Sequence, residues 1–327
     1  MKRMPTGHRP KSHAWTADFP DTTTTIVFVQ FGIQHHDSLD VARDAYQTIG
    51  RSLRGAFAPR HIDSATTVDI EGYTNDVWIA YWDSLETYEA WKAQDFVQKW
   101  FAGVPTGATY GYWHEALTIP KDRLETLHSG ENYDNGVSHF TPLKYTNLHE
   151  YWGGMRDRMS ASDHDDFESP LQALPEIQLR ETRGKHIRVK APDHVAFIRT
   201  AQNWTKCGPE EKETYETDVF PTLVKANDYL ASRDPASGCI SSLLFQEPGS
   251  KTCVAAYFLS LKHLEDWAKT HPTHLEIFRV FFKMLEKYNY KTELALWHEV
   301  SVLKSDEMDL FYSNCHPLTG FLPHWNA

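Results

Sequence analysis

The chain has 327 residues, with 44 acidic against 33 basic side chains and a formal net charge of −11 at pH 7. This charge argues against nucleic acid as a partner, because phosphate binding needs lysine and arginine side chains clustered on one face. No apolar stretch approaches the roughly 18 residues of a membrane-spanning helix, so no membrane partner is expected. The four cysteines are widely spaced without a CxxC pair, a pattern that indicates neither a zinc site nor a disulfide framework. A protein of the reducing cytoplasm is therefore expected.

The N-terminal stretch, residues 1–20, begins MKRMPTGHRPKS and is basic, but it lacks the apolar core of a signal peptide. We expect it to form an arm that drapes over the fold. Residues 21–124 are expected to form a first half of the molecule. In chain order its predicted elements are a buried strand over 24–34, a helix over 40–53, a strand over 75–82, a helix over 85–101 and a strand over 110–119.

A second half is expected over residues 191–305. Its predicted elements are strands over 193–200, 238–246, 252–259 and 294–303, a helix over 211–232, and a helical stretch over 261–288 that breaks near Pro272. The stretch between the halves, 125–190, is polar and irregular. It is too long for a simple connector, so it is expected to be a functional insertion or disordered. The tail, 306–327, is expected to wrap back over the fold.

The two halves contain a repeat. Residues 80–91 (AYWDSLETYEAW) align one for one with residues 256–267 (AYFLSLKHLEDW), and YWHE after the first copy matches LWHE after the second. Each half is therefore predicted to run strand–helix–strand–strand–helix–strand, the split βαβ pattern of a ferredoxin-like unit. The sequence thus predicts an α+β fold, in which duplicated ferredoxin-like halves form a dimeric-α/β-barrel-type β-barrel flanked by helices.

The two copies differ at one position that could bind a metal. Gln98 of the first copy aligns with His274 of the second, which ends the string HPTH. An amide is a poor ligand for iron or zinc, whereas a neutral imidazole is a common one. We expect Pro272 at the first position of a helix, with Thr270 or His271 as its cap. A single histidine beside aromatic residues fits an axial haem ligand better than a zinc site, although a capping or surface histidine is the alternative.

A second candidate is His298, which lies in the predicted strand LWHEVSV. Strand alternation places it on the same face as Leu296 and Val300, so it is expected to point into an apolar barrel interior. There an imidazole could exchange a proton near neutrality. His114 occupies the same place in the first copy, so one of the two histidines could be only a core residue.

Three further polar residues are candidates on weaker grounds. A buried Arg158 would mark an anionic or polar ligand group, and the alternative is a surface ion-pair cluster with Arg156 and Asp157. Thr200 ends the strand VAFIRT, where its hydroxyl could orient a substrate or bond only to backbone. Glu125, in LETLHSG, could pair with an arginine or relay protons.

Six motifs, taken together and in this order, resemble the aldoxime dehydratases, particularly the bacterial phenylacetaldoxime type. They are HSGENYDNGVSHF, HEYWGGMRDRM, FIRTAQNW, THPTH, ALWHEVSVL and NCHPLTGFLP. Members of this family are lyases that use haem b to convert an aldoxime, R–CH=N–OH, into a nitrile and water. The resemblance implies ferrous haem b as cofactor, the substrate nitrogen bound to its iron, a small-molecule aldoxime as substrate, a homodimer, and the duplicated barrel fold.

The resemblance also implies roles for five residues. His274, the second histidine of HPTH, matches the proximal haem ligand, and His298 matches the distal general acid and base. Arg158, the second arginine of RDR, matches the pocket arginine, and Glu125 matches the glutamate of the family's FETL-type motif. Thr200 stands where well-known members have serine, so it keeps the hydroxyl and adds a methyl group.

Two other functions fit the same residues. One is a haem peroxidase or chlorite-dismutase-like enzyme, which shares the barrel architecture and would act from ferric haem on a peroxide or chlorite. The other is a non-catalytic haem-binding barrel protein, in which neither His298 nor Arg158 would matter to turnover.

Overall fold

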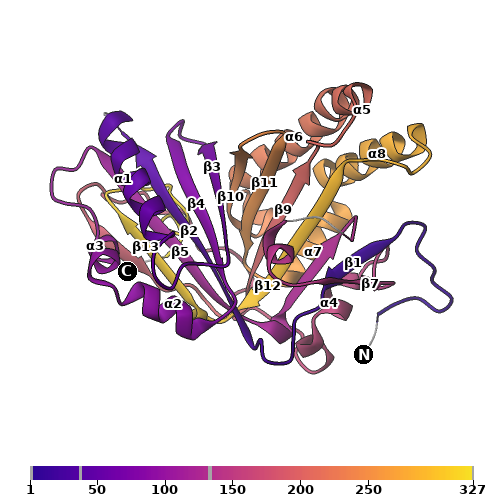
Figure 1. The fold of residues 1–327 in the computed structure, drawn as a ribbon, viewed down its shortest axis with the longest axis horizontal. Coiled ribbons are helices and arrows are strands. Elements are labelled where there is room, and N and C mark those ends of the chain that lie inside the picture. Colours follow the sequence, from indigo (N-terminus) through magenta and orange to yellow (C-terminus); the bar gives the residue numbers. More distant parts are fainter. Residues whose placement is uncertain (1–2, 37–38, 132–134, 326–327) are drawn as a thin grey trace. The chain divides into compact units, whose positions relative to one another are not determined.

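The computed structural model describes residues 3–36, 39–131 and 135–325. The chain divides into two compact units, each assembled from three segments (Figure 1). Unit 1 comprises Met1–Phe19, Asp122–Ala173 and His194–Val302, and unit 2 comprises Pro20–Lys121, Leu174–Asp193 and Leu303–Ala327. The predicted insertion 125–190 is therefore shared between the two units. Residues 132–134 of the motif HSGENYDNGVSHF lie outside the described residues, as do the ends of the predicted arm and tail.

Unit 1 contains a sheet with the strand order β7-β1-β6-β12-β9-β11-β10. Its strands are β1 Ala14–Ala17, β6 Leu124–His128, β7 Leu143–Thr146, β9 Val195–Asn203, β10 Cys239–Glu247, β11 Lys251–Phe258 and β12 Ala295–Leu303. Its α-helices are α4 Gly154–Arg158, α5 Pro209–Thr214, α6 Phe220–Ala231, α7 Leu261–Thr270 and α8 Pro272–Lys287. A π-helical turn (Tyr215–Val219) joins α5 to α6, and 3-10 turns cover Gly136–His139, Ser160–Asp163 and Pro235–Ser237.

The main core of unit 1 lies between one face of this sheet and the helices α6 and α7. The side chains of Val254 on β11 and Val300 on β12 lie on this face. They pack in one cluster with Leu230 of α6 and Leu264 of α7. Strand alternation puts every second residue of β12 on this face, and therefore His298 with Val300. A smaller cluster, which includes Val280 and Met284, fixes α8 on the π-helical turn and its surroundings.

Unit 2 contains a sheet with the strand order β3-β4-β2-β5-β13-β8. Its strands are β2 Thr25–His35, β3 His61–Val68, β4 Thr74–Trp82, β5 Tyr110–Pro120, β8 His186–Val189 and β13 Met308–Ser313. Its helices are α1 Leu39–Ser52, α2 Leu85–Lys92 and α3 Asp95–Phe101, with 3-10 turns at Ser305–Glu307 and, at the segment boundary, Lys121–Arg123. The core beneath α1, α2 and α3 is rich in aromatic side chains, among them Phe31, Trp78, Trp82 and Trp91.

Most predicted elements are confirmed within a few residues, and the differences are local. The helix predicted over 85–101 is two helices, α2 and α3, because the chain leaves helical pairing at Ala93 and Gln94. The helix predicted over 211–232 contains the π-helical turn between α5 and α6. The repeat pattern predicts a strand between α1 and β4, but no residue range is predicted for it, and β3 fills that place. The stretch 125–190 contains short strands that no long alternating pattern marks.

The last segment of the chain lies in unit 2. Strand β13 pairs with β5, and beyond it the His316 backbone N–H donates to Gln34 Oε1 while the His316 ring contacts Asp69 at 2.9 Å. In the part of the chain that the structure describes, no helix is long and apolar enough to cross a membrane.

Candidate active site

His274 lies in the first turn of α8, directly after the break between α7 and α8. His271 is the cap of α8: its ring nitrogen Nδ1 accepts a hydrogen bond from the Thr273 backbone N–H at 3.3 Å, and Pro272 is the first helical residue. Of the two caps that the sequence left open, His271 is therefore the one used, and Thr270 is the last residue of α7. The predicted position of His274 is confirmed.

The His274 ring is oriented by a backbone carbonyl. Its Nδ1 lies 2.6 Å from the carbonyl oxygen of Ala268, and a carbonyl only accepts, so Nδ1 carries the proton. Burial lowers the pKa of His274 to about 4, against the opposing effect of this hydrogen bond, so the ring is neutral at pH 7. Its lone pair is then on Nε2, and none of the residues that the structure describes hydrogen-bonds to that atom. This is the state in which a histidine binds a metal.

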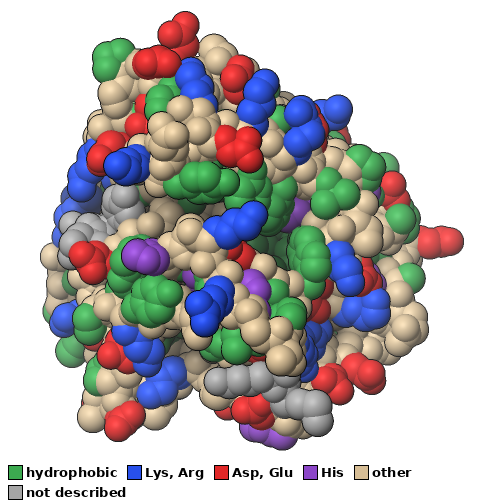
Figure 2. All heavy atoms as spheres, turned by 90° about the vertical axis from the view of Figure 1, so that its right-hand side faces the viewer, with side chains coloured by type: hydrophobic (Ala, Val, Ile, Leu, Met, Phe, Trp, Pro, Cys, Tyr) green, Lys and Arg blue, Asp and Glu red, His purple; other side chains and the backbone are tan. Residues whose placement is uncertain are grey.

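Aromatic side chains border His274, and several of them are exposed. The ring centroids of Trp267 and Phe278 lie 4.7 and 5.0 Å from that of His274. Phe278 is 43% exposed, and Trp152, whose ring is 6.3 Å from that of Phe278, is 51% exposed. On the face seen from the right of Figure 1, hydrophobic side chains border a hollow, with basic, acidic and histidine side chains beside them (Figure 2). A neutral imidazole beside exposed aromatic rings fits a large, flat, apolar group such as haem.

The second group of site residues is the His298 cluster, formed by His298, Glu125 and Arg158. Strands β12 and β6 pair antiparallel with Val300 opposite Glu125, which brings Glu125 onto the same face as His298. His298 Nε2 lies 3.0 Å from Glu125 Oε1, and Arg158 Nε donates to Glu125 Oε2 at 2.6 Å. Arg158 Nη2 lies 3.4 Å from His298 Nε2, and its Nη1 donates to the carbonyl of Leu148.

The charges of this cluster support one another. Burial alone would raise the pKa of Glu125, but the charges and hydrogen bonds of Arg158 and His298 outweigh it and hold that pKa below its usual value. Glu125 is therefore an ionised carboxylate, although it is almost fully buried. His298 Nε2 lies between a permanent donor, Arg158, and an acceptor, Glu125, so the ring has a partner whether or not Nε2 is protonated. Such a group can both give and take a proton.

The prediction that His298 faces an apolar interior is wrong. Val300, on the same face, packs against helices α6 and α7, and the immediate neighbours of His298 are the charged Glu125 and Arg158. Alternation along β12 correctly placed His298 on the same face as Val300. Its charged neighbours, however, come from β6 and α4, and no pattern in β12 shows that these two elements lie beside it. The His298 side chain is 23% exposed, so the imidazole remains accessible.

The surface ion-pair cluster of Arg156, Asp157 and Arg158 does not form. Arg156 bonds to Glu265 on α7, and Asp157 accepts hydrogen bonds from the backbone of Arg3, so the two neighbours of Arg158 face other partners. The Arg158 side chain is 5% exposed and is committed to the His298 cluster.

Thr200 lies on β9, beside β12 in the sheet, and is half-buried. Its hydroxyl has a weak contact, 3.5 Å to the carbonyl of Trp297. The hydroxyl is therefore free to turn toward another acceptor at little cost. All five predicted site residues thus lie in unit 1. The sequence indicated aromatic residues beside His274, but it did not reveal that Trp152 joins them or that Trp152 and Phe278 are exposed, because exposure leaves no mark in a sequence.

Unit 2 contains a counterpart of the His298 cluster, which we call the His114 cluster: His114, Asp309, Arg188 and Lys92. Asp309 on β13 stands opposite Ala116, just as Glu125 stands opposite Val300, in each case two residues beyond the histidine. His114 Nε2 is 3.6 Å from an Asp309 oxygen, and Asp309 also pairs with Lys92 at 3.2 Å and with Arg188.

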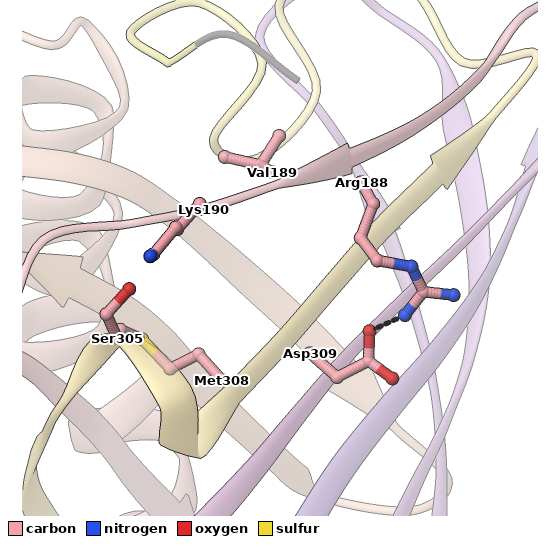
Figure 3. A pocket seen from close by; sticks show the side chains of 6 residues that line it. All are labelled: Arg188, Val189, Lys190, Ser305, Met308 and Asp309. Atoms are coloured by element: carbon pink, nitrogen blue, oxygen red, sulfur yellow. Dashed lines mark hydrogen bonds and ion pairs between the residues drawn. The ribbon is translucent and has the colours of Figure 1, made fainter.

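The arginine of the His114 cluster reaches Asp309 from the neighbouring strand β8 (Figure 3). A pocket of unit 2 opens beside this pair and is lined by Arg188, Val189, Lys190, Ser305, Met308 and Asp309. His114 itself is fully buried, and the ring of Phe101 packs 4.3 Å from it. The acid–histidine–arginine arrangement therefore occurs in both units, but only in unit 1 is the histidine accessible.

Comparison with known proteins identifies the family to which the chain belongs. The family model for haem-containing dehydratases matches residues 29–321. The chain is 51% identical to a phenylacetaldoxime dehydratase from Bacillus sp. (strain OxB-1), over all of this chain and 95% of that protein. It is 29% identical to an aliphatic aldoxime dehydratase from Rhodococcus globerulus, over 98% of this chain and 93% of that one.

Solved structures agree with the sequence comparison. A crystal structure of an aldoxime dehydratase matches with a TM-score of 0.91 at 26% identity, covering 99% of this chain and 95% of that one. An aldoxime dehydratase in complex with butyraldoxime matches with a TM-score of 0.92 at 26% identity, covering 99% of this chain and 92% of that one. The mixed α/β fold with antiparallel strand ladders is thus that of a known enzyme type. On the extent of the family match and the full-length identity, this chain belongs to the haem-containing dehydratase family.

Proposed function

We propose that this protein converts aldoximes into nitriles and water, with haem b held by His274 and His298 acting as general acid and base. The full-length similarity to phenylacetaldoxime dehydratase supports the reaction and suggests an arylalkyl aldoxime as substrate. The observation that carries the chemistry is the position of His298 Nε2 between the Arg158 guanidinium and the Glu125 carboxylate. His274 is suited to the haem because its ring is neutral, its Nδ1 is fixed and its Nε2 is unpaired among the described residues.

Ferrous haem on His274 would supply an open iron position for the aldoxime nitrogen and electron density that weakens the N–O bond. The protein must then remove the oxygen as water rather than as hydroxide. In the proposed reaction His298 gives its proton to the departing hydroxyl oxygen. The same nitrogen then takes the proton from the aldoxime carbon, which completes R–C≡N and restores the acid. Acid–base catalysis of this kind contributes about 10²–10⁴-fold.

Glu125 and Arg158 support His298 in both halves of this cycle. The Glu125 carboxylate stabilises the protonated ring, and the Arg158 guanidinium donates to the neutral one. Arg158 and the hydroxyl of Thr200 would also hold the oxime hydroxyl group near His298, a positioning effect. Because Thr200 has only a long contact to the Trp297 carbonyl, it can turn to the substrate without breaking a strong bond.

We further propose that the two units are duplicated ferredoxin-like halves, of which only the half over 191–305 carries haem. The strand order supports this proposal. Counted along the chain, the four strands of each half lie side by side in the order second, third, first, fourth: β10-β11-β9-β12 in unit 1 and β3-β4-β2-β5 in unit 2. The pairing of the two halves in a barrel, and the division of the chain into arm, halves, insertion and tail, stay predictions.

Cytoplasmic localisation and a homodimer are also proposed. The four cysteines are free thiols, and three of them are buried, as suits a reducing compartment. Light scattering on the purified protein tests the dimer.

The test of the function is an absorbance spectrum of the dithionite-reduced protein with phenylacetaldoxime, followed by detection of phenylacetonitrile. Wild type is expected to show a Soret shift and nitrile. His298→Ala is expected to keep haem and form no nitrile, and His274→Ala to lose the Soret band. If His298→Ala loses haem and His274→Ala keeps it, the two roles are reversed.

A peroxide assay distinguishes the second candidate. An arginine beside a distal histidine also suits O–O cleavage, so the oxidised protein is assayed with hydrogen peroxide in parallel. Peroxidase turnover without nitrile formation would support that alternative, and neither activity in a haem-loaded protein would support a non-catalytic haem-binding protein.

A further inference from the structure

The break between α7 and α8 leaves the carbonyl of Ala268, among the last carbonyls of α7, without its usual partner. In an α-helix the carbonyl of residue i accepts from the N–H of residue i+4. For Ala268 that residue is Pro272, and proline has no N–H. The donor that Ala268 has instead is the His274 ring, whose Nδ1 lies 2.6 Å from the carbonyl oxygen.

The conformation at the break follows from the same proline. A residue before proline is driven out of the helical region, and His271 is extended, with φ −79° and ψ 133°. Its ring is held in place from two sides: Nδ1 accepts from the Thr273 N–H, and Tyr229 of α6 stacks on it with ring centroids 3.8 Å apart and planes 14° apart. The first turn of α8, which carries His274, therefore starts from a fixed point.

Unit 2 has the same contact with a different side chain. Gln98 matches His274 in the repeat, Lys92 matches Ala268, and Gln98 Nε2 donates to the Lys92 carbonyl at 2.6 Å. The break there lies at Ala93 and Gln94 and contains no proline. A side chain that satisfies the carbonyl is thus common to both units. The imidazole, with a second nitrogen left over, and the proline belong to unit 1 alone.

We propose that Pro272 is a positioning residue for the iron ligand: because it lacks an N–H, the Ala268 carbonyl stays available to His274 Nδ1, and the lone pair of the His274 ring is thereby kept on Nε2. This inference rests on the proposed function, in which Nε2 binds haem iron. At position 272, the first residue of α8, a residue with an N–H would compete for the same carbonyl. In unit 2 the matching Phe96 is the second residue of α3, because that helix begins one position earlier, after Gln94. The His274 ring would then lose both its fixed tautomer and its fixed orientation, and losses of this kind weaken metal binding about 10–100-fold.

The first measurement needs no variant. In the haem-free wild-type protein, ¹⁵N NMR of the histidine rings is expected to show His274 as a neutral ring with the proton on Nδ1. A ring protonated on Nε2 instead would overturn the proposal directly.

The second measurement compares Pro272→Ala with the wild type. The variant is expected to show a mixture of His274 tautomers in the haem-free protein, and about 10–100-fold faster transfer of haem to apomyoglobin. Its ferrous iron–histidine stretching frequency is expected to fall, because the ring loses the hydrogen bond that makes Nε2 more basic. Pro209→Ala is the matched control, since Pro209 also stands at the start of a helix, α5, without a histidine that depends on it.

The outcomes separate this inference from the proposed function. If Pro272→Ala keeps the Nδ1-protonated tautomer and the wild-type rate of haem loss, the carbonyl contact does not need a proline, as in unit 2, and the inference is wrong. His274→Gln is expected to lose haem whichever way that result falls. If His274→Gln retains haem, the proposed ligand itself is wrong.

Discussion

The His298 cluster of unit 1 and the His114 cluster of unit 2 have the same groups in the same register, yet different surroundings. In unit 2 the rings of Phe101 and Phe311 lie 4.3 and 5.3 Å from the ring of His114, which is fully buried. In unit 1 the His298 side chain is 23% exposed. An acid, a histidine and an arginine in register therefore do not by themselves make a catalytic site. The histidine must also face open space.

Two further positions of the repeat show why the space beside His114 in unit 2 is filled with side chains. Extending the repeat by two residues matches Trp78 with Val254, and their strand partners are Phe31 and Thr200. Phe31 is thus the counterpart of Thr200, and its ring lies 6.4 Å from that of His114. Where unit 1 has a hydroxyl and an imidazole ligand, unit 2 has a phenyl ring and Gln98. The two units therefore differ at the residues that admit and hold ligands more than at those that move protons.

The largest expected effect separates the two histidines. His298→Gln removes the group that exchanges the proton, so kcat is expected to fall about 10²–10⁴-fold with haem content unchanged. His114→Gln is the matched control and is expected to change kcat of the folded enzyme by less than about threefold, since no step of the proposed reaction uses it. Steady-state assays at equal haem concentration check both. Equal losses in the two variants would contradict the assignment.

The next effect concerns the rings that fill unit 2. Phe101→Ala removes a buried ring beside His114 and is expected to lower the free energy of unfolding by about 3–5 kcal/mol. Phe278→Ala, beside His274, is expected to cost the haem-free protein less than about 1 kcal/mol because that ring is 43% exposed. Urea unfolding of the haem-free proteins measures both changes.

Phe278→Ala is instead expected to speed haem loss. A Phe278→Ala variant that loses as much stability as Phe101→Ala without haem would show that unit 1 is packed at this point rather than open.

A third difference is acid sensitivity. His128 of β6 is fully buried, stacks on Trp297, and has neither ring nitrogen hydrogen-bonded among the described residues. Burial also lowers the pKa of His114, but there the Asp309 carboxylate opposes the effect and the Tyr112 hydroxyl is a hydrogen-bond partner. Burial, with a smaller effect from His298, lowers the pKa of His128 to about 4. As pH falls from about 6.5 to 4 the unfolded chain binds a proton that the folded one does not, so stability falls by roughly 3 kcal/mol.

His128→Phe tests this difference. The variant keeps a ring to stack on Trp297 and removes the titration, so its loss of stability between pH 7 and pH 4.5 is expected to be smaller than that of the wild type. Urea unfolding at the two pH values measures it. The same loss in both proteins would assign the acid sensitivity to other groups.

The smallest expected effect is at Thr200. Thr200→Ser keeps the hydroxyl and is expected to hold kcat/KM within about threefold, whereas Thr200→Val removes one hydrogen bond and is expected to lower it about tenfold. Haem content is the control for both. If Thr200→Val matches the wild type, the hydroxyl does not position the substrate.

Much of this site could be predicted from the sequence because its parts are local. The string HPTH gives the proline, the cap and the first-turn position of His274 without any long-range contact. The strand LWHEVSV gives the face of His298 by alternation. These features depend on residues a few positions apart, where backbone geometry alone decides.

The surroundings of His298 could not be predicted, since they depend on long-range pairing. Glu125 reaches it through β6, a strand of five residues whose register on β12 is set by the assembled sheet. Arg158 reaches it through the short helix α4. Likewise, the motifs YWHE and LWHE are nearly the same, and neither shows that Phe101 packs on His114 whereas His298 stays accessible.

The most direct test of the account is a haem titration of the haem-free protein, followed by its Soret absorbance. Wild type is expected to bind one equivalent of haem. His274→Gln gives unit 1 the side chain that unit 2 has at this position, with the carbonyl contact of Gln98 as its precedent, and is expected to bind none. One full equivalent bound by His274→Gln with an unchanged Soret band would contradict the central claim that His274 of unit 1 holds the haem.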